Sequence, residues 1–271
     1  FDGRFGPGLP AISDGQMLFM LNGVKKLKEG SGRMAIIQNG SSLFTGDAGS
    51  GASAIRRYVI EGDLVEAIIQ LPSDLFYNTG ISTYIWVLTR GKDLHRGGKI
   101  QLIDASRCFV KRRKNIGSKR VDLDDACIDL ILRAYEEFSN ETYEENGLVV
   151  ESKVFDNSYF GFTKVTVETA QADKDGKPVL KKGKYQPVKG ASDTEIIPLQ
   201  DDIDEYMKKN VLPYNPLAYI DPAKDKIGYE VPFTRLFYKF VAPQSSAAIF
   251  EDIKTLEAEE TILMKELFGH A

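Results

Sequence analysis

The stretch LVEAIIQLPSDLFYNTGISTYIWVLT, residues 64–89, decides the fold of this chain. Its first and last parts are short apolar runs that are typical of buried strands. The connection between them has no helical pattern and is short for a crossover that carries a helix, which a parallel pair of strands would need. We therefore expect strand 84–89 to lie antiparallel to strand 64–71.

The connection itself contains two residues that turns rarely use. Pro72 and Gly80 fit the backbone requirements of turns, but Phe76 and Tyr77 do not. Either the two rings fold back and cap the core, or they are held outward to meet something flat. Ligands of α/β sheets bind beyond the carboxyl ends of the strands, and Phe76 directly follows strand 64–71. A ring at that place, with small neighbours giving close access, could stack on a base turned out of a duplex.

The surrounding segments extend the same pattern in both directions. Apolar spacing predicts a helix at 17–28 and another at 52–61, with a buried strand at 34–37 between them and a further strand at 99–104. Alternating helices and buried strands are typical of an α/β fold with a parallel sheet. Strand 84–89 would close that sheet as an antiparallel strand.

The composition changes beyond Ser106. The run KRRKNIGSKR, residues 111–120, holds six basic residues and no acid. It is either a solvated loop or a phosphate-binding segment made of Lys111, Arg112, Arg113, Lys114, Lys119 and Arg120. Residues 160–190 are expected to form a hairpin with a lysine-rich, solvated arm. A closing amphipathic helix, about 245–267, either packs on the core or docks a partner chain.

Several classes of site are excluded by composition. The chain has 271 residues and a net charge of −4, so nucleic acid binding would need a local basic patch. His95 and His270 are expected on the surface, which leaves neither a catalytic triad nor a zinc site. The glycine-rich TGDAGSG lacks the ending of a phosphate-binding P-loop.

Other features concern the surface and the surroundings of the chain. Two cysteines suit a reducing, cytoplasmic compartment, and no apolar run is long enough to span a membrane. Arg56 and Arg57 are expected on the surface of helix 52–61.

Several blocks carry a specific resemblance. These are GRMAIIQNGSSLF, IRRYVIEGDLVEAIIQLPSDLFYNTGISTYIWVL, GKIQLIDASRCF, SKVFDNSYFGFTKVTVE, DTEIIPLQDDIDEYMKKNVLPYNPLAYID and KIGYEVPFTRLFYKF. In this order they resemble the methylation subunit of type I restriction–modification systems, a group of DNA adenine N6-methyltransferases. The resemblance covers nearly the whole chain except the lysine-rich arm.

The resemblance implies a Rossmann-like core that uses S-adenosylmethionine and needs no metal. In this family an Asn-Pro-Pro-aromatic motif accepts hydrogen bonds from the flipped adenine amine, and a second aromatic residue after the sixth strand stacks on the base. Phe76 matches that second position, so the resemblance implies a target pocket that includes Phe76, Tyr77 and Gly80. Residues 36–40 match the strand end that walls the pocket, which adds Asn39.

One departure limits what this chain can do. It has no Asn-Pro-Pro-Phe/Tyr, and its Asn215-Pro216 belongs to another block. It also has no glycine-rich strand–loop for the cofactor. We therefore expect a fragment with no catalytic or cofactor-binding residues of its own, inactive alone, that holds the later half of the methyltransferase sheet, ending in an antiparallel strand, and a mixed, partly helical tail.

The resemblance also implies how the chain divides into regions and which partners it has. The expected regions are 1–106, the carboxyl-terminal half of the core; 107–244, a basic linker, helix and hairpin-containing tail; and 245–271, the closing helix. The implied partners are DNA and the specificity and restriction subunits. The alternative function is a non-catalytic assembly module that scaffolds a DNA-binding complex.

Overall fold

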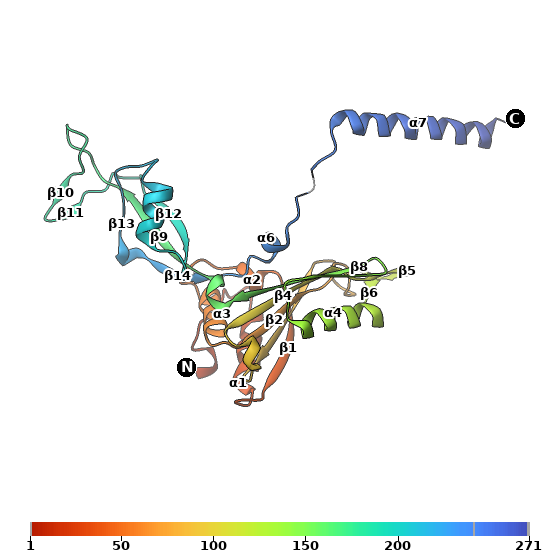
Figure 1. The fold of residues 1–271 in the computed structure, drawn as a ribbon, viewed down its shortest axis with the longest axis horizontal. Helices are drawn as coiled ribbons and strands as arrows, with labels where there is room; N and C mark the ends of the chain where they lie inside the picture. The colour runs from red at the N-terminus through yellow and green to blue at the C-terminus, as the bar shows by residue number, and fades with distance from the viewer. Residues whose placement is uncertain (1, 241, 270–271) are drawn as a thin grey trace. The chain divides into compact units, whose positions relative to one another are not determined.

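The computed structural model describes residues 2–240 and 242–269. His270, expected on the surface, lies outside the described residues. The chain divides into two compact units, one reaching Leu236 and the other beginning at Phe237. Figure 1 labels most of their helices and strands.

Between Gln16 and Arg107 the longer helices and strands largely follow the segments that apolar spacing predicts. The larger unit begins with η1 (Gly3–Phe5), α1 (Gln16–Lys26), β1 (Arg33–Asn39), α2 (Ser41–Phe44), α3 (Gly51–Glu61), β2 (Val65–Gln70), β3 (Thr83–Thr89), η2 (Leu94–Arg96) and β4 (Lys99–Arg107). It continues with β5 (Val110–Ile116), β6 (Lys119–Asp122), α4 (Asp125–Glu137), β7 (Thr142–Glu145), β8 (Leu148–Asp156) and η3 (Asn157–Phe160). The remaining elements of the chain are β9 (Gly161–Thr169), β10 (Leu180–Lys181), β11 (Lys184–Tyr185), β12 (Asp193–Pro198), α5 (Ile203–Tyr206), η4 (Met207–Val211), β13 (Ala218–Ile220), η5 (Pro222–Lys224), β14 (Lys226–Tyr229), α6 (Phe233–Phe237) and α7 (Ser246–Phe268).

A six-stranded mixed sheet forms the centre of the larger unit, in the order β1-β3-β2-β4-β8-β7. The predicted antiparallel pairing of β2 with β3 is confirmed, with Ile69 opposite Ile85. On its other side β2 runs parallel to β4, with Ile69 opposite Ile103. The α/β class therefore holds, but the expected parallel sheet does not: of the five neighbouring pairs that the structure describes in this sheet, only β2 with β4 is parallel.

The place of the antiparallel strand differs from the prediction. β3 does not close the sheet, because β1 pairs with its far side from Arg33↔Thr89 to Asn39↔Thr83. The sheet also continues past residue 106, where a regional boundary was expected, because β8 returns antiparallel along β4. The pairings of β1 with β3 and of β4 with β8 join strands that are far apart in the sequence, so no local sequence pattern predicts them.

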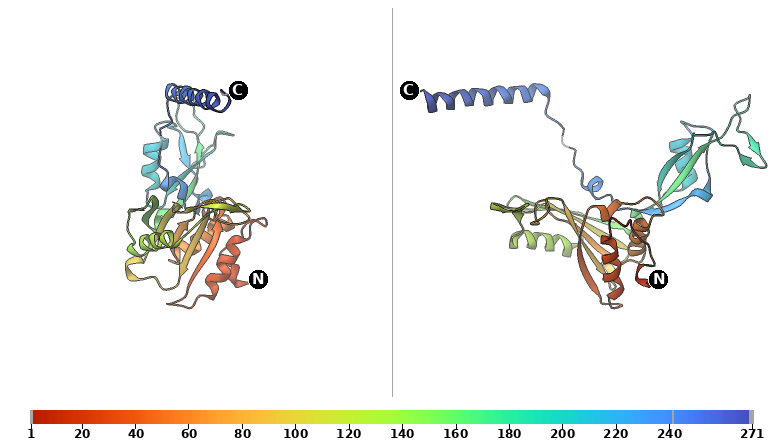
Figure 2. Two further views of the ribbon diagram at one scale, coloured as in Figure 1. Left: turned by 90° about the vertical axis from the view of Figure 1, so that its right-hand side faces the viewer. Right: turned by 180° about the vertical axis from the view of Figure 1, so that it is seen from behind.

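The two faces of the sheet follow the alternation of its side chains. On one face, Ile69 and Ile103 pack with Leu130 and Ala134 of α4 in one buried cluster. On the other face, the indole Nε1 of Trp86 donates to Ser42 Oγ of α2 at 3.1 Å. Figure 2 shows α4 on one side of the sheet and α1 on the other.

Arg56, expected on the surface of helix 52–61, is instead buried. The side chain is fully buried, and its guanidinium donates to the carbonyl oxygen of Tyr229 at 2.6 Å and to that of Ser42 at 3.2 Å. Burial lowers the pKa of Arg56 to about 10. The arginine thereby ties α3 to β14, whose carbonyl comes from the far end of the unit. Its neighbour Arg57 remains on the surface as expected, in an i,i+4 pair with Glu61.

The second sheet of the larger unit is built around β9. β12, β13 and β14 all pair antiparallel with β9 (Figure 1). The expected hairpin within 160–190 is wrong in its partner strand, because β9 pairs with β12 beyond the lysine-rich arm. The arm, rich in polar and charged residues, forms its own small hairpin from β10 and β11.

The smaller unit consists mainly of α7, which confirms the closing helix. Ser245 caps it by accepting a hydrogen bond from the backbone of Ala248 at 3.2 Å. No residue of α7 is buried, and its apolar stripe includes Leu256 and Leu267, which are 64% and 73% exposed. Over residues 2–240 and 242–269, no helix has the length and apolar character that a membrane crossing requires.

Candidate nucleic-acid interface

The 71–83 loop, which joins β2 to β3, is an ordered structure. Its two arms face one another through a series of contacts. These are Leu71 N–H to Thr83 O at 2.8 Å, Ser73 Oγ to Ser82 Oγ at 3.0 Å, Asp74 N–H to Gly80 O at 3.3 Å, and a β-bridge between Phe76 and Thr79. The loop therefore continues the β2–β3 hairpin outward and presents its aromatic residues near the tip.

Phe76 and Tyr77 are not sealed in the core. Phe76 is half-buried and Tyr77 is 61% exposed. Gly80, predicted to give close access, is exposed as well. The alternative in which the rings cap the core does not describe Tyr77 and describes Phe76 only in part.

The loop lies at the edge of the sheet where three parallel strands end. β1 ends at Asn39, which is opposite Thr83, and β2 ends at Gln70, which is opposite Asp104 near the end of β4. The carboxyl ends of β1, β2 and β4 thus meet at one edge, where ligands of α/β sheets bind. The structure brings Asn39 to the same edge as the loop, with β3 between them.

Asn39 is exposed but already engaged through its amide oxygen. This oxygen accepts from Gln16 Nε2 at 2.9 Å and from the backbone N–H of Ser41 at 3.0 Å. Asp14 accepts from Ser41 Oγ at 2.8 Å. Burial raises the pKa of Asp14, but hydrogen bonds from Ser41 and Gln16 outweigh it, so the pKa is lowered overall. Asn39, Ser41, Gln16 and Asp14 are therefore bonded to one another, whereas Oε1 of Gln38, the residue before Asn39, is buried without a hydrogen-bond partner.

The basic run 111–120 is a β-hairpin, which corrects the reading of a solvated loop or linker. β5 and β6 pair antiparallel, and Gly117 sits in the turn with φ of +59°. We call residues 110–122 the basic hairpin. Its cations are exposed or half-buried: Lys111, Arg113, Lys114 and Arg120 are exposed, and Arg112 and Lys119 are half-buried.

Two of the six cations are paired within the basic hairpin. Arg112 and Lys119 both form ion pairs with Asp122, the latter at 2.9 Å. These partners hold the pKa of Asp122 below its usual value, the hydrogen bond from Lys119 being the first cause. Among the ion pairs between described residues, none involves the other four cations. Those four are available to a polyanion.

The basic hairpin and the 71–83 loop touch each other. The backbone N–H of Ser118 donates to Tyr77 O at 2.9 Å, and that of Arg120 donates to Asp74 O at 2.8 Å. Lys119 Nζ lies 5.3 Å from the centre of the Tyr77 ring, a cation–π contact. The two segments that the sequence singled out separately thus form one surface.

A cavity of about 400 Å³ lies between the loop and the basic hairpin. It is lined by Ser73, Asp74, Ser106, Phe109, Lys111, Arg112, Asn115, Arg120 and Val121. Phe76 is not among these residues. The sequence analysis missed Ser106, Phe109 and Asn115. Ser106 and Phe109 flank the end of β4, and they could have been found because ligands of α/β sheets bind beyond the carboxyl ends of the strands.

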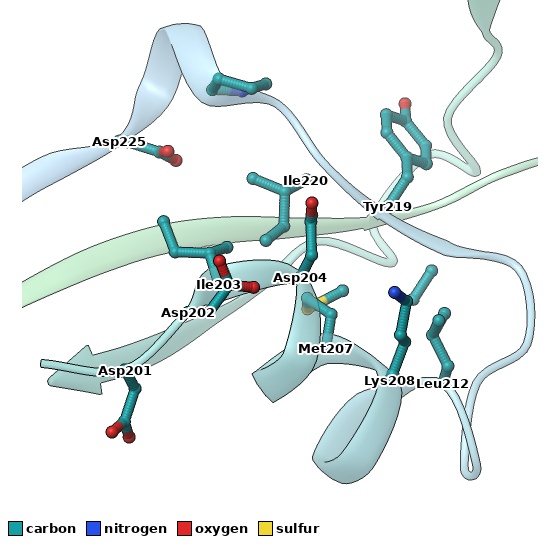
Figure 3. A pocket seen from close by; sticks show the side chains of 12 residues that line it. Asp201, Asp202, Ile203, Asp204, Met207, Lys208, Leu212, Tyr219, Ile220 and Asp225 are labelled. Carbon is teal, nitrogen blue, oxygen red and sulfur yellow. The ribbon is translucent and has the colours of Figure 1, made fainter. Parts of the chain in front are cut away.

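A second cavity, of about 680 Å³, lies between α5, η4 and β13, away from the predicted residues. Figure 3 shows its side chains, with apolar Met207 and Ile220 among the carboxylates of Asp202, Asp204 and Asp225. Burial raises the pKa of Asp225, and its Oδ1 has no hydrogen-bond partner. Within the described ranges, no group of three His, Cys, Asp or Glu side chains is arranged to hold a metal ion.

Comparison with known proteins gives one family. The family model described as N-6 DNA Methylase matches residues 2–175. The MjaVIII methylase subunit of Methanocaldococcus jannaschii, a type I restriction enzyme subunit, is 33% identical over 108 residues, which is 40% of this chain and 18% of the relative. The HindI methylase subunit of Haemophilus influenzae, also of a type I enzyme, is 29% identical over 186 residues, or 67% and 40% of the two chains.

Solved structures include a related protein. The methyltransferase subunit of a type I restriction–modification system from Streptococcus thermophilus is 27% identical, with a TM-score of 0.49, over 59% of this chain and 31% of that one. The chain spans less than half the length of the curated relatives that it matches. From the match over residues 2–175 and the relatives named above, the chain belongs to the N-6 DNA methylase family, and its relatives are methylase subunits of type I restriction enzymes.

Proposed function

We propose that the chain is part of the modification subunit of a type I restriction–modification enzyme, which transfers methyl from S-adenosylmethionine to the exocyclic amine of adenine in DNA. The observation that carries this proposal is the joined surface of the 71–83 loop and the basic hairpin. It places half-buried Phe76 and exposed Tyr77 on the same surface as the exposed cations of the basic hairpin, at the carboxyl edge of the sheet, in a chain of the N-6 DNA methylase family.

Four residues of this chain have distinct proposed roles in binding the flipped adenine. Phe76 stacks on the adenine after it has left the duplex, and Tyr77 borders the same place. Gly80 leaves room for close approach. Asn39 contributes to the wall of the pocket through its amide nitrogen, because its amide oxygen is occupied by Gln16 and Ser41. Stacking orients the base and replaces the contacts that it loses on flipping.

The cofactor supplies the electrophilic methyl group when it is bound. The residues of this chain do not fit its site: the sequence lacks an Asn-Pro-Pro-aromatic motif and a glycine-rich strand–loop, and the side-chain oxygens of Asn39 and Asp14 near the end of β1 already accept hydrogen bonds from Gln16 and Ser41. We propose that other parts of the subunit hold S-adenosylmethionine, and that this chain alone does not methylate DNA. Within the described residues β1 has a strand partner on one side only, so its free edge would receive the rest of the sheet.

The basic hairpin should account for part of the affinity for DNA. Replacing Lys111, Arg113 and Lys114 with Gln in the intact subunit removes three cations that contact phosphates in this proposal. Each phosphate contact contributes roughly 0.9 to the slope of log K against log salt for duplex DNA. We expect the slope to fall by about 2 to 3 and the affinity to drop at every sequence, as measured by fluorescence anisotropy over a salt series.

The matched control lies on the lysine-rich arm. Replacing exposed Lys181, Lys182 and Lys184 with Gln removes the same charge from the same chain. The control should leave the salt slope near that of the wild type. Equal slopes for both triple variants would assign the effect to overall charge and reject the basic hairpin as a phosphate-binding site.

α7 is proposed as the contact for the specificity subunit, with the restriction subunit and DNA completing the assembly. Its exposed apolar stripe is the support for this role. Deletion after Pro243 is expected to weaken co-purification of the specificity subunit, measured with tagged subunits at matched expression. Replacing Glu257 and Glu259, both exposed on α7, with Gln serves as a control that keeps the stripe. Unchanged co-purification of the deletion variant would rule this role out.

A second candidate function is a non-catalytic module that scaffolds a DNA-binding assembly. The exposed stripe of α7 and the cations of the basic hairpin would suit that role without any chemistry at Phe76. Methyl transfer by the complete subunit with and without Phe76 separates the two functions. In either case we propose a cytoplasmic location, which free, buried Cys108 and Cys127 suit.

A further inference from the structure

We propose that the turn of the basic hairpin positions the 71–83 loop for stacking, with Gly117 as the positioning residue. This inference rests on the proposed function and deepens it. In addition to binding phosphates, the basic hairpin would hold the aromatic tip of the 71–83 loop in place through main-chain contacts.

Gly117 is required at the contact for two reasons. Its φ of +59° lies in the left-handed region that favours glycine. A Cβ at this position would also lie 2.4 Å from the carbonyl oxygen of Tyr77. That oxygen accepts the N–H of Ser118 at 2.9 Å, so the turn and the loop approach as closely as backbone atoms allow. A side chain at position 117 therefore requires the turn and the Tyr77 backbone to move apart.

A second point of contact fixes the base of the loop. The N–H groups of Arg120 and Val121 both point to Asp74 O, at 2.8 and 3.4 Å. Asp74 itself has φ of +59°, an uncommon conformation for a residue other than glycine, which the surrounding contacts must maintain. The loop is therefore held by main-chain bonds on both sides of Phe76, at Asp74 and at Tyr77.

The consequence is mechanical coupling between phosphate binding and base stacking. Lys111, Arg113 and Lys114 lie on β5, and Arg120 carries both an exposed cation and the N–H bound to Asp74. When DNA binds these cations, the hairpin sets the distance from the DNA backbone to the ring of Phe76. Displacement of Tyr77 would misplace the ring without removing any cation.

The test compares Gly117→Ala with Gly147→Ala in the intact subunit with its partner subunits. Gly147 also has a positive φ, +82°, in the turn between β7 and β8, but a Cβ there meets no atom within 4 Å. Both changes place a Cβ at a positive φ, and only the first brings that Cβ against the loop. Single-turnover methyl transfer, DNA affinity and hydrogen exchange of the amides of residues 74–80 are measured for each.

Gly117→Ala should slow methyl transfer roughly 10- to 100-fold, since a misplacement of about 1 Å can cost on the order of 100-fold, and should speed amide exchange in the loop. Its DNA affinity should stay within about twofold, because no phosphate-binding cation is lost, and Gly147→Ala should match the wild type in all three measurements. Equal rates and equal exchange for the two variants would overturn the inference. If Gly117→Ala does not fold, Gly117→Asn and Gly147→Asn replace the pair, because Asn tolerates a positive φ and still carries a Cβ.

Phe76→Ala, measured beside these variants, separates the two levels of the proposal. Slower transfer for Phe76→Ala together with equal rates for Gly117→Ala and Gly147→Ala overturns only the positioning role. Normal transfer for Phe76→Ala overturns the stacking role of Phe76, and the positioning role with it.

Discussion

Phe76→Ala is expected to slow methyl transfer by the intact subunit roughly 5- to 150-fold. The reason is that stacking of a base on an aromatic ring is worth about 1–3 kcal/mol, and the rate falls by this factor if the whole amount is lost in the transition state. Phe76 is half-buried at the tip of an ordered loop, and among the described residues its ring has no aromatic or cationic partner of its own. The measurement is single-turnover transfer of labelled methyl to a duplex that contains one target site.

Controls for Phe76→Ala keep either the ring or the bulk. Phe76→Tyr retains a ring of the same kind and should transfer methyl within a few-fold of the wild type, whereas Phe76→Leu keeps apolar volume and should resemble the alanine variant. Thermal unfolding and DNA affinity of the three variants show whether the subunit is intact. Wild-type transfer by Phe76→Ala would mean that the ring only packs.

Glu66→Ala is expected to lower the free energy of unfolding of the chain by about 3–5 kcal/mol. Glu66 and Arg96 are 1% and 4% exposed, and Glu66 Oε1 lies 3.7 Å from Arg96 Nη1. The carboxylate also accepts from Tyr135 Oη at 2.5 Å and from Arg33 Nη2 at 2.8 Å. Burial and the hydrogen bond to Glu66 raise the pKa of Tyr135 to about 12. Removal of the carboxylate leaves the Arg96 cation buried without its anion.

Urea unfolding of the chain measures this loss. Glu144→Ala is the matched control, because Glu144 is exposed and the change should stay within about 0.5 kcal/mol. The double variant Glu66→Met with Arg96→Met should be more stable than Glu66→Ala, since an apolar pair leaves no buried charge. A loss for Glu66→Ala as small as that of Glu144→Ala would show that water reaches Arg96 and replaces the carboxylate.

The elements of the sheet could be predicted from the sequence because each carries a local signal. The apolar runs at 64–71 and 84–89 and the length of their connection were sufficient to predict an antiparallel pair, which the register of β2 and β3 confirms. The pairing of β1 with β3 could not be predicted, because Arg33 and Thr89 are brought together by tertiary packing alone. Likewise, nothing near Arg56 announces that Tyr229, 173 residues away, supplies its acceptor.

The sequence analysis found the 71–83 loop and the basic run separately, but it did not predict that they contact each other. Phe76 and Tyr77 stood out because aromatic residues are rare in turns, and the basic run stood out by charge. The two segments are joined by main-chain hydrogen bonds of Asp74, Tyr77, Ser118 and Arg120. Main-chain groups are common to nearly all residue types, so the sequence carries no signal of this contact. Gly117 is the one residue there whose identity reflects the contact, and a glycine between hairpin strands is explained equally well by the turn itself.

Stacking of Phe76 on the target base is tested most directly by replacing the target adenine with 5-iodouracil and irradiating the complex of this DNA with the intact subunit. This base forms a covalent link chiefly with an aromatic ring stacked on it, and mass spectrometry of the digested protein identifies the residue. The proposed function predicts an adduct on Phe76 that disappears in Phe76→Leu, while the same base placed outside the site gives none. Adducts that never fall within residues 74–80 would contradict it.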